Sequence, residues 1–215
     1  MHSLIIFDSD GVLVDSEIIS NRIMAQSIRS VGGLMTDEEV LSTYIGGTMV
    51  EVIRDVESRI GRSLPTDWLQ TFEKQRADAF RLELKAIDGV KEVVQLLSRK
   101  HVPFCVASQA KVEKTQLTLG LTGLLEFFND HIFSSTMVPR PKPFPDLFLY
   151  AAQKFAVPSS ECVVIEDSAK GVTAAVAAGM KVFGYAPKTG DASSLSRAGA
   201  QVFDEMRNLP YLLGL

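Results

Sequence analysis

The stretch LIIFDSDGVLVDSE runs from Leu4 to Glu17 and predicts how the rest of the chain is organised. Its first four residues form an apolar run with the length of a buried strand, and two carboxylates, Asp8 and Asp10, follow directly. Asp is depleted in strands, and α/β sheets bind ligands at the carboxyl ends of their strands, so this acidic pair indicates a functional site. Gly11 lets the backbone turn away without a Cβ. The simpler alternative is an ordinary Asp-Gly turn, and these four residues alone do not decide between the two.

The composition is that of a globular protein. The chain has 215 residues, 46% of them hydrophobic, and a formal net charge of -4. It has no basic block, which argues against nucleic acid as the main partner. No apolar run reaches the roughly 18–20 residues of a membrane span, and the amino terminus lacks the layout of a secretion signal. We therefore expect a cytoplasmic protein without membrane contact, as a monomer or a weak oligomer.

The sequence lacks the residue patterns of several other kinds of functional site. Cys105 and Cys162 lie in apolar, strand-like runs and are predicted to be small buried side chains. The three histidines are scattered, so neither a zinc cluster nor a histidine-based triad is predicted. The glycines form neither GxGxxG nor GxxxxGK[ST], so the usual nucleotide-binding fingerprints are absent from the sequence.

The pattern of apolar residues changes once along the chain. Helical spacing predicts four successive helices between Ser16 and Leu84 with no strand among them, and Thr36 and Glu39 have the spacing of a capping box. From Asp88 onward, helices alternate with short apolar runs, which predicts a parallel sheet with right-handed crossovers.

The predicted fold class is therefore α/β, with a helical insertion. We expect a Rossmann-like parallel-sheet core domain formed by residues 1–15 and 86–215, and a helical cap domain formed by residues 16–85. A cap next to the acidic pair is well placed to close over a substrate. After the insertion, the expected strands are 102–107, 132–134, 162–165, 181–185 and 201–203.

Further polar residues follow the predicted strands. Ser108 ends one apolar run, Lys142 lies in the loop RPKPFPD, and Glu166 and Asp167 follow VVI. The carboxyl ends of parallel strands share one crevice, so these side chains should converge on the acidic pair. A cation, a hydroxyl donor and carboxylates that can hold Mg²⁺ are the groups that phosphoryl transfer needs. Ser168 is predicted to cap the helix that follows.

Four segments carry a specific resemblance. FDSDGVLVDSE, VASQ, RPKPFPD and VIEDSAKGVTAAVAAGM resemble, in this order, the four motifs of the haloacid dehalogenase (HAD) superfamily. The resemblance covers nearly the whole chain. It implies that Asp8 is a nucleophile that forms an aspartyl-phosphate, and that Asp10 acts first as general acid and then as general base.

The same resemblance implies the ligand contacts. Ser108, Gln109 and Lys142 would hold the phosphoryl group, although Gln109 stands where the family more often has Asn. The cofactor implied is Mg²⁺. Of the adjacent acids Glu166 and Asp167, either one could be its direct ligand. The implied metal-binding residues are Asp8, Asp10, Asp167 and Glu166.

The insertion resembles the cap of the branch that includes phosphoglycolate phosphatase and β-phosphoglucomutase. We therefore expect a Mg²⁺-dependent phosphatase for a small phosphorylated metabolite, a sugar or sugar-acid phosphate; the motif wording most resembles a 6-phosphogluconate phosphatase type. A β-phosphoglucomutase-like phosphomutase is the alternative, disfavoured because residues 16–21 lack the histidine that the mutases carry near the start of the cap. A non-catalytic phospho-receiver is the alternative of another class, disfavoured by the large insertion. Basic cap residues are candidates for pairing with a substrate carboxylate, although such side chains are mostly solvated: Arg22, Arg54, Lys74, Arg76 and Arg81.

Overall fold

The computed structural model describes residues 3–44, 48–187 and 190–215. The chain divides into two compact units. The core unit comprises Met1–Asp15 and Lys85–Leu215, and the cap unit comprises Ser16–Leu84.

The core unit is built on a parallel sheet of six strands in the order β3-β2-β1-β4-β5-β6. This confirms the predicted α/β fold class. The first strand in the sequence lies inside the sheet, with β2 on one side and β4 on the other, so the strand order reverses at β1. In open α/β sheets such a switch point leaves a crevice at the carboxyl ends of the strands. The strands are β1 (Leu4–Phe7), β2 (Phe104–Ser108), β3 (Ile132–Ser134), β4 (Cys162–Glu166), β5 (Lys181–Tyr185) and β6 (Gln201–Phe203).

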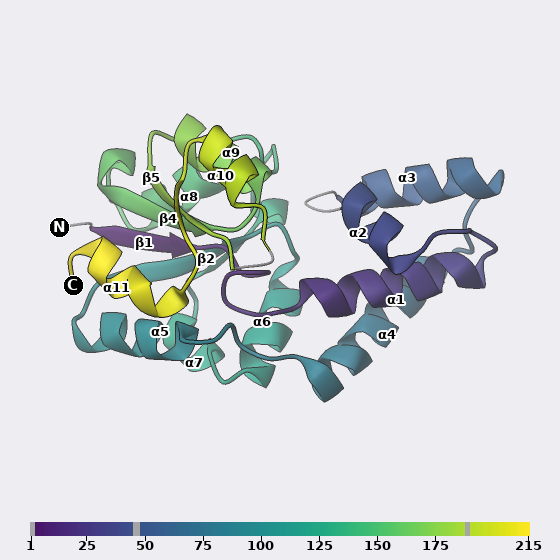
Figure 1. The fold of residues 1–215 in the computed structure, drawn as a ribbon, viewed down its shortest axis with the longest axis horizontal. Helices are drawn as coiled ribbons and strands as arrows, with labels where there is room; N and C mark the ends of the chain where they lie inside the picture. The colour runs from purple at the N-terminus through teal and green to yellow at the C-terminus, as the bar shows by residue number, and fades with distance from the viewer. Residues whose placement is uncertain (1–2, 45–47, 188–189) are drawn as a thin grey trace. The chain divides into compact units, whose positions relative to one another are not determined.

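Helices cover both faces of this sheet, because its strands are apolar on both sides. Figure 1 shows α8, α9 and α10 on one side of the sheet, and α5, α7 and α11 on the other. On the first side, Phe148 and Val172 belong to one cluster with Ile6 of β1. On the second side, the ring of Phe7 meets that of Phe128 edge to face. The helices are α5 (Val90–Arg99), α6 (Val112–Leu121), α7 (Leu125–Phe128), α8 (Asp146–Lys154), α9 (Ala169–Ala177), α10 (Ala192–Ala198) and α11 (Leu209–Leu213).

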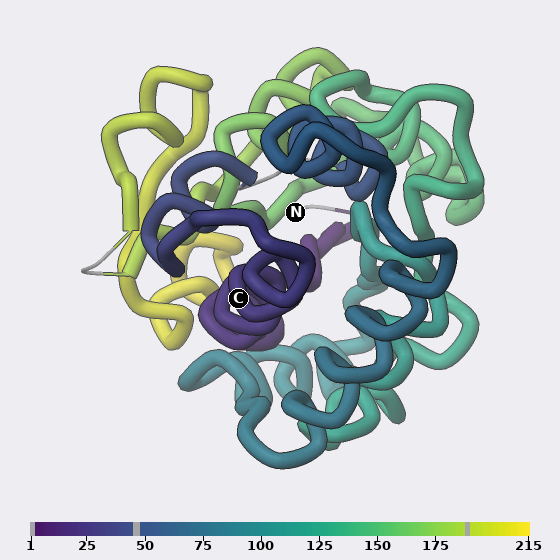
Figure 2. Tube along the Cα trace, turned by 90° about the vertical axis from the view of Figure 1, so that its right-hand side faces the viewer, coloured from purple at the N-terminus to yellow at the C-terminus, as the bar shows by residue number. Residues whose placement is uncertain are grey.

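The cap unit has four helices in its described residues and a hydrophobic core of its own. Trp68 is buried there, stacks on Phe72, and donates an Nε1–H hydrogen bond of 3.1 Å to the Ser27 carbonyl. Thr36 and Glu39 form the predicted capping box. Figure 2 shows these helices following one another from purple to blue-green. They are α1 (Glu17–Ser30), α2 (Asp37–Tyr44), α3 (Met49–Ile60) and α4 (Trp68–Glu83).

The observed elements differ from the predicted ones in a few places. The strand predicted from Val102 begins at Phe104 instead, since Pro103 has no N–H to give to a sheet, and it includes Ser108. The short helices α10 and α11 were not predicted.

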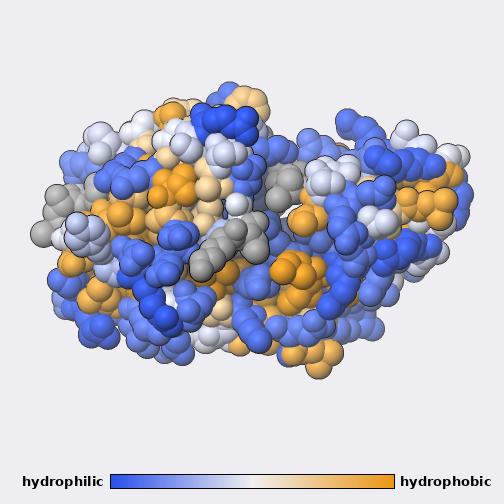
Figure 3. Space-filling view, viewed as in Figure 1, coloured by the Kyte–Doolittle hydropathy of each residue, from blue (hydrophilic) through white to orange (hydrophobic). Residues whose placement is uncertain are grey.

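In the described ranges, none of the helices combines the length and the apolar character that a bilayer crossing requires. On the face drawn in Figure 3, hydrophobic residues form separate groups among hydrophilic ones.

Candidate active site

Three buried charged side chains meet at the carboxyl ends of β1 and β4. Asp8 directly follows β1, Glu166 ends β4, and Lys142 comes from the loop before α8. The Lys142 Nζ donates to Asp8 Oδ1 and to Glu166 Oε1, each at 2.6 Å. Only 2% of the Lys142 side chain is exposed, although lysines are mostly exposed in folded proteins. The fold therefore holds one ammonium group between two carboxylates at the switch point of the sheet.

The charged groups of this site shift the pKa values of their neighbours. Burial raises the pKa of Asp8 to about 7; the Glu166 and Asp10 carboxylates act in the same direction, and Lys142 opposes them. Burial alone would lower the pKa of Lys142, but its two carboxylate partners outweigh burial and raise that pKa above its usual value. Lys142 therefore keeps its positive charge in a site that largely excludes water.

The second oxygen of Glu166 is also engaged. Glu166 Oε2 accepts hydrogen bonds of 2.9 Å from the backbone N–H groups of Asp167 and Ser168 and from the Ser168 hydroxyl. A Cβ at Gly171 would overlap the Glu166 carboxyl group, so α9 can approach it only with glycine there. Ser168 also accepts a 3.1 Å hydrogen bond from the Gly171 N–H, which confirms the predicted helix cap. Both Glu166 oxygens thus bind groups of the protein itself.

Asp167 approaches the backbone of the first acidic turn. Gly11 has a φ of 76°, and a Cβ built there would overlap the Asp167 carboxylate. Asp167 therefore lies against the turn that carries Asp8 and Asp10. In residues 3–44, 48–187 and 190–215, however, no three His, Cys, Asp or Glu side chains are already grouped as a metal site.

Ser108 and Gln109 follow one another at the end of β2, and Gln109 contacts Lys142. Ser108 ends β2, is 1% exposed, and accepts a 3.1 Å hydrogen bond from the Ala110 N–H. The Gln109 amide accepts a 3.2 Å hydrogen bond from the Lys142 N–H and donates one of 3.4 Å to the Lys142 carbonyl. Both ends of the Gln109 amide are therefore bonded to the main chain of Lys142, and its role as a phosphate ligand stays a prediction.

A second lysine, which the sequence analysis did not single out, contacts the second carboxylate. Lys114 Nζ forms an ion pair with Asp10 Oδ1. Side-chain exposure is 13% for Lys114 and 27% for Asp10. A signal was present in the sequence, because the helix after Ser108 begins at the same sheet edge as the acidic pair. That signal does not distinguish Lys114 from Lys111.

Within the cap unit, several basic residues already have partners. Arg22 pairs with Glu83 at 2.6 Å, Arg81 with Asp78 at 2.7 Å, and the Arg76 guanidinium lies 4.8 Å from the centre of a phenylalanine ring. Pairing of Arg22, Arg76 or Arg81 with a substrate would compete with these contacts.

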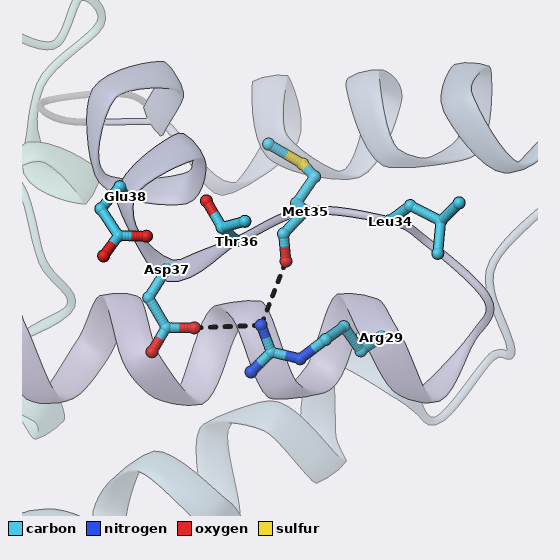
Figure 4. Close-up of a pocket in the computed structure, with 6 residues that line it drawn as sticks. All are labelled: Arg29, Leu34, Met35, Thr36, Asp37 and Glu38. Carbon is cyan, nitrogen blue, oxygen red and sulfur yellow. Dashed lines mark hydrogen bonds and ion pairs between the residues drawn. The ribbon is translucent and has the colours of Figure 1, made fainter.

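A hollow of about 560 Å³ lies in the cap unit between the end of α1 and the start of α2. Figure 4 shows the residues that line it. The cation among its lining residues is Arg29, which donates hydrogen bonds of 3.0 Å to Asp37 and 3.1 Å to the Met35 carbonyl. The contacts of Arg29 thus tie α1 to α2. The lining residues are Arg29, Leu34, Met35, Thr36, Asp37 and Glu38.

A central strand that ends in an acidic pair, a buried lysine beside it and a helical unit inserted after it define a class of hydrolytic α/β enzymes. The sequence model described as haloacid dehalogenase-like hydrolase matches residues 5–185, and the chain belongs to this family. The resemblance of the four motifs is thereby confirmed.

The relatives include named proteins and a solved structure. The chain is 34% identical over 180 residues to the 6-phosphogluconate phosphatase of Escherichia coli (strain K12), covering 83% of this chain and 80% of that protein. It is 33% identical over 184 residues to a probable pseudouridine-5'-phosphatase of Drosophila melanogaster, covering 82% and 78%. A HAD family hydrolase from Deinococcus radiodurans, solved with bound phosphate and sodium, superposes with a TM-score of 0.81 at 30% identity, covering 99% of this chain and 95% of that one. Together with the family, these relatives make the chain a phosphomonoester hydrolase.

Proposed function

We propose that this enzyme is a Mg²⁺-dependent phosphatase that hydrolyses a sugar or sugar-acid phosphate through an aspartyl-phosphate on Asp8. The observation that carries the proposal is the buried Lys142 ammonium, which lies 2.6 Å from Asp8. A fixed cation beside a nucleophilic carboxylate can hold the oxygens of a phosphoryl group while its phosphorus is attacked, and it needs no reorganisation when charge develops.

The residues present fit Mg²⁺. The donors beside Gly11 are oxygen atoms, which Mg²⁺ prefers, and Asp167 already lies against the turn that carries Asp8. Because both Glu166 oxygens hold Lys142 and the start of α9, we assign the direct contact to Asp167 and a positioning role to Glu166. The residues that would hold the ion are Asp8, the Asp10 carbonyl and Asp167. Bound there, Mg²⁺ would offset negative charge on the phosphoryl oxygens.

In the first step, an Asp8 carboxylate oxygen attacks phosphorus and the bond from phosphorus to the ester oxygen breaks. Asp10, whose Oδ1 faces Lys114, gives a proton carried on its Oδ2 to the ester oxygen, so the alcohol leaves neutral. In the second step, Asp10 takes a proton from water as the water oxygen attacks phosphorus, and the bond from phosphorus to Asp8 breaks. Such proton transfer contributes typically 10²–10⁴-fold, so it must act together with the nucleophile and with charge stabilisation.

Lys142 and Ser108 are proposed to hold the phosphoryl oxygens during both steps. The Gln109 amide fixes the main chain of Lys142 through two hydrogen bonds, so we propose that Gln109 acts by positioning Lys142. The bond from Lys142 to Glu166 fixes the other side of the ammonium group.

The substrate class rests on the relatives. The Escherichia coli relative is named for 6-phosphogluconate, a sugar-acid phosphate, and it is similar over most of both chains. We therefore propose substrates of this chemistry. Membership of a family of hydrolases sets aside the phospho-receiver alternative, and no contact in the described residues favours a phosphomutase.

The test is release of inorganic phosphate with Mg²⁺ from a panel of sugar, sugar-acid, nucleotide and glycolate phosphates. We expect sugar-acid or sugar phosphates to be turned over best, and Asp8→Ala to eliminate release from every compound. Asp15→Asn is the matched control. Asp15 lies seven residues after Asp8 in the same segment and is exposed, so its replacement should leave turnover unchanged. Phosphate release retained by Asp8→Ala would overturn the mechanism, and a preference for nucleotides would overturn the substrate class.

A further inference from the structure

We propose that Lys114 is a positioning residue that holds the Asp10 carboxylate on the leaving-group side of the site. This inference rests on the proposed function, since it takes Asp10 as the group that exchanges protons with the leaving group and with water. The observation behind it is the ion pair between Lys114 Nζ and Asp10 Oδ1.

The packing of α6 directs Lys114 into the crevice. The next residue, Thr115, and Leu119 one turn later are fully buried, while α6 packs against β3. These contacts fix how the helix is rotated about its axis. Lys114 is left with a 13% exposed side chain, which is low for a lysine, whereas its neighbour Glu113 is exposed.

The two lysines divide the two carboxylates between them. Lys142 binds Asp8 Oδ1, and Lys114 binds Asp10 Oδ1. The nucleophile and the acid-base group must act at opposite ends of the breaking bond, so their carboxylates must stay apart. Lys114 on α6, separate from Lys142 in the loop before α8, provides that separation. Without it, Asp10 loses the ion pair that fixes its Oδ1, and its carboxyl group is held less precisely at the ester oxygen.

The consequence for the reaction depends on the leaving group. An alkoxide needs the proton from Asp10 as the bond from phosphorus to oxygen breaks, whereas an activated phenolate leaves without one. Misplacing Asp10 should therefore slow attack on alkyl phosphates and spare attack on activated aryl phosphates. A lysine that only supported the fold would change both equally.

The experiment measures single-turnover phosphorylation of the Mg²⁺-loaded enzyme by 2,4-dinitrophenyl phosphate and by the best alkyl ester of the panel. For Lys114→Met we expect a loss of about 10–100-fold with the alkyl ester, part of what a general acid contributes, and less than about threefold with the aryl ester. The steady-state KM for the alkyl ester should stay within about threefold on the same reasoning, and Lys114→Arg, which keeps the cation, should restore most of the rate. Lys100→Met, which removes an exposed lysine, is the matched control.

Equal losses with both esters, no loss with either, or a rise confined to KM would each overturn the positioning role. The last result would instead show that Lys114 binds the substrate. Failure of the proposed function itself is recognised separately: wild-type enzyme would cleave neither ester, or Asp8→Ala would retain activity, and the inference would fall with it.

Discussion

Replacing Lys142 with methionine should destabilise the core unit in a way that depends on pH. The substitution keeps most of the side-chain volume but leaves two carboxylates, Asp8 at 7% and Glu166 at 1% exposure, without their shared cation. Breaking a buried ion pair in this way costs about 3–5 kcal/mol. That is a large part of the 5–15 kcal/mol by which a typical protein is stable.

The pH dependence follows from the carboxyl groups. Burial already raises the pKa of Asp8, and Lys142 is the neighbour that opposes the rise, so its removal raises that pKa further. A carboxyl whose pKa is higher in the folded than in the unfolded state stabilises the fold at low pH, and this stabilisation is lost as pH rises through the folded-state pKa. The loss caused by Lys142→Met should therefore be greater at pH 8 than at pH 5, by up to about 1.4 kcal/mol, because the wild-type carboxyl, with a pKa of about 7, already ionises one pH unit below pH 8.

The assay is urea unfolding followed by far-UV circular dichroism at both pH values. The fluorescence of the single tryptophan, Trp68, reports the cap unit separately and should change little. Adding Glu166→Gln to Lys142→Met removes one of the two uncompensated carboxylates and should recover part of the lost free energy of unfolding at pH 8. Lys100→Met, at an exposed site, is the control and should lower the free energy of unfolding by about 0.5 kcal/mol or less. A loss below about 1 kcal/mol, or one equal at pH 5 and pH 8, would refute the reasoning, because neither fits a buried uncompensated pair.

Two further substitutions test the supports of the site. Gly11→Ala places a Cβ against the Asp167 carboxylate at a backbone position with positive φ. The Mg²⁺ concentration for half-maximal activity should therefore rise by about 10–100-fold. An unchanged Mg²⁺ titration would contradict the assignment of Asp167 as a metal ligand. Ser168→Ala removes the cap of α9 and one hydrogen-bond donor to Glu166. Urea unfolding should show that the free energy of unfolding falls by about 1–2 kcal/mol, and Ser168→Thr, which keeps the hydroxyl, should largely avoid this loss. Equal losses in both variants would contradict the capping role.

Much of the core could be predicted because its strands are buried on both faces. LIIF, IFS and KVFGY are short runs with few charged residues, and the observed strands β1, β3 and β5 have the predicted bounds. The site candidates follow from the same pattern, because a polar residue directly after such a run must lie at the shared edge of the sheet. The short helix α10 carried too weak a signal, since seven residues hold little periodicity.

Contacts that depend on tertiary packing could not be predicted. Glu166 and Asp167 are adjacent acids, and only the space left by Gly171 shows that Glu166 turns toward Lys142 and the start of α9. Lys114 is one of two lysines near the start of α6, and its contact with the acidic pair depends on how that helix is rotated. Sequence spacing gives the sheet edge to which a residue belongs, but not which oxygen meets which donor there.

The central claim is that Asp8 carries the phosphoryl group. The most direct measurement is the mass of peptides from Asp10→Asn enzyme that has been mixed with Mg²⁺ and 2,4-dinitrophenyl phosphate, whose leaving group needs no acid, and then quenched in acid. We predict the added mass of one phosphoryl group on the peptide that contains Asp8, because without Asp10 as base the second step is slow. An unmodified Asp8 peptide during active turnover, or a phosphoryl group that remains when Asp8 is also replaced by asparagine, would contradict the account.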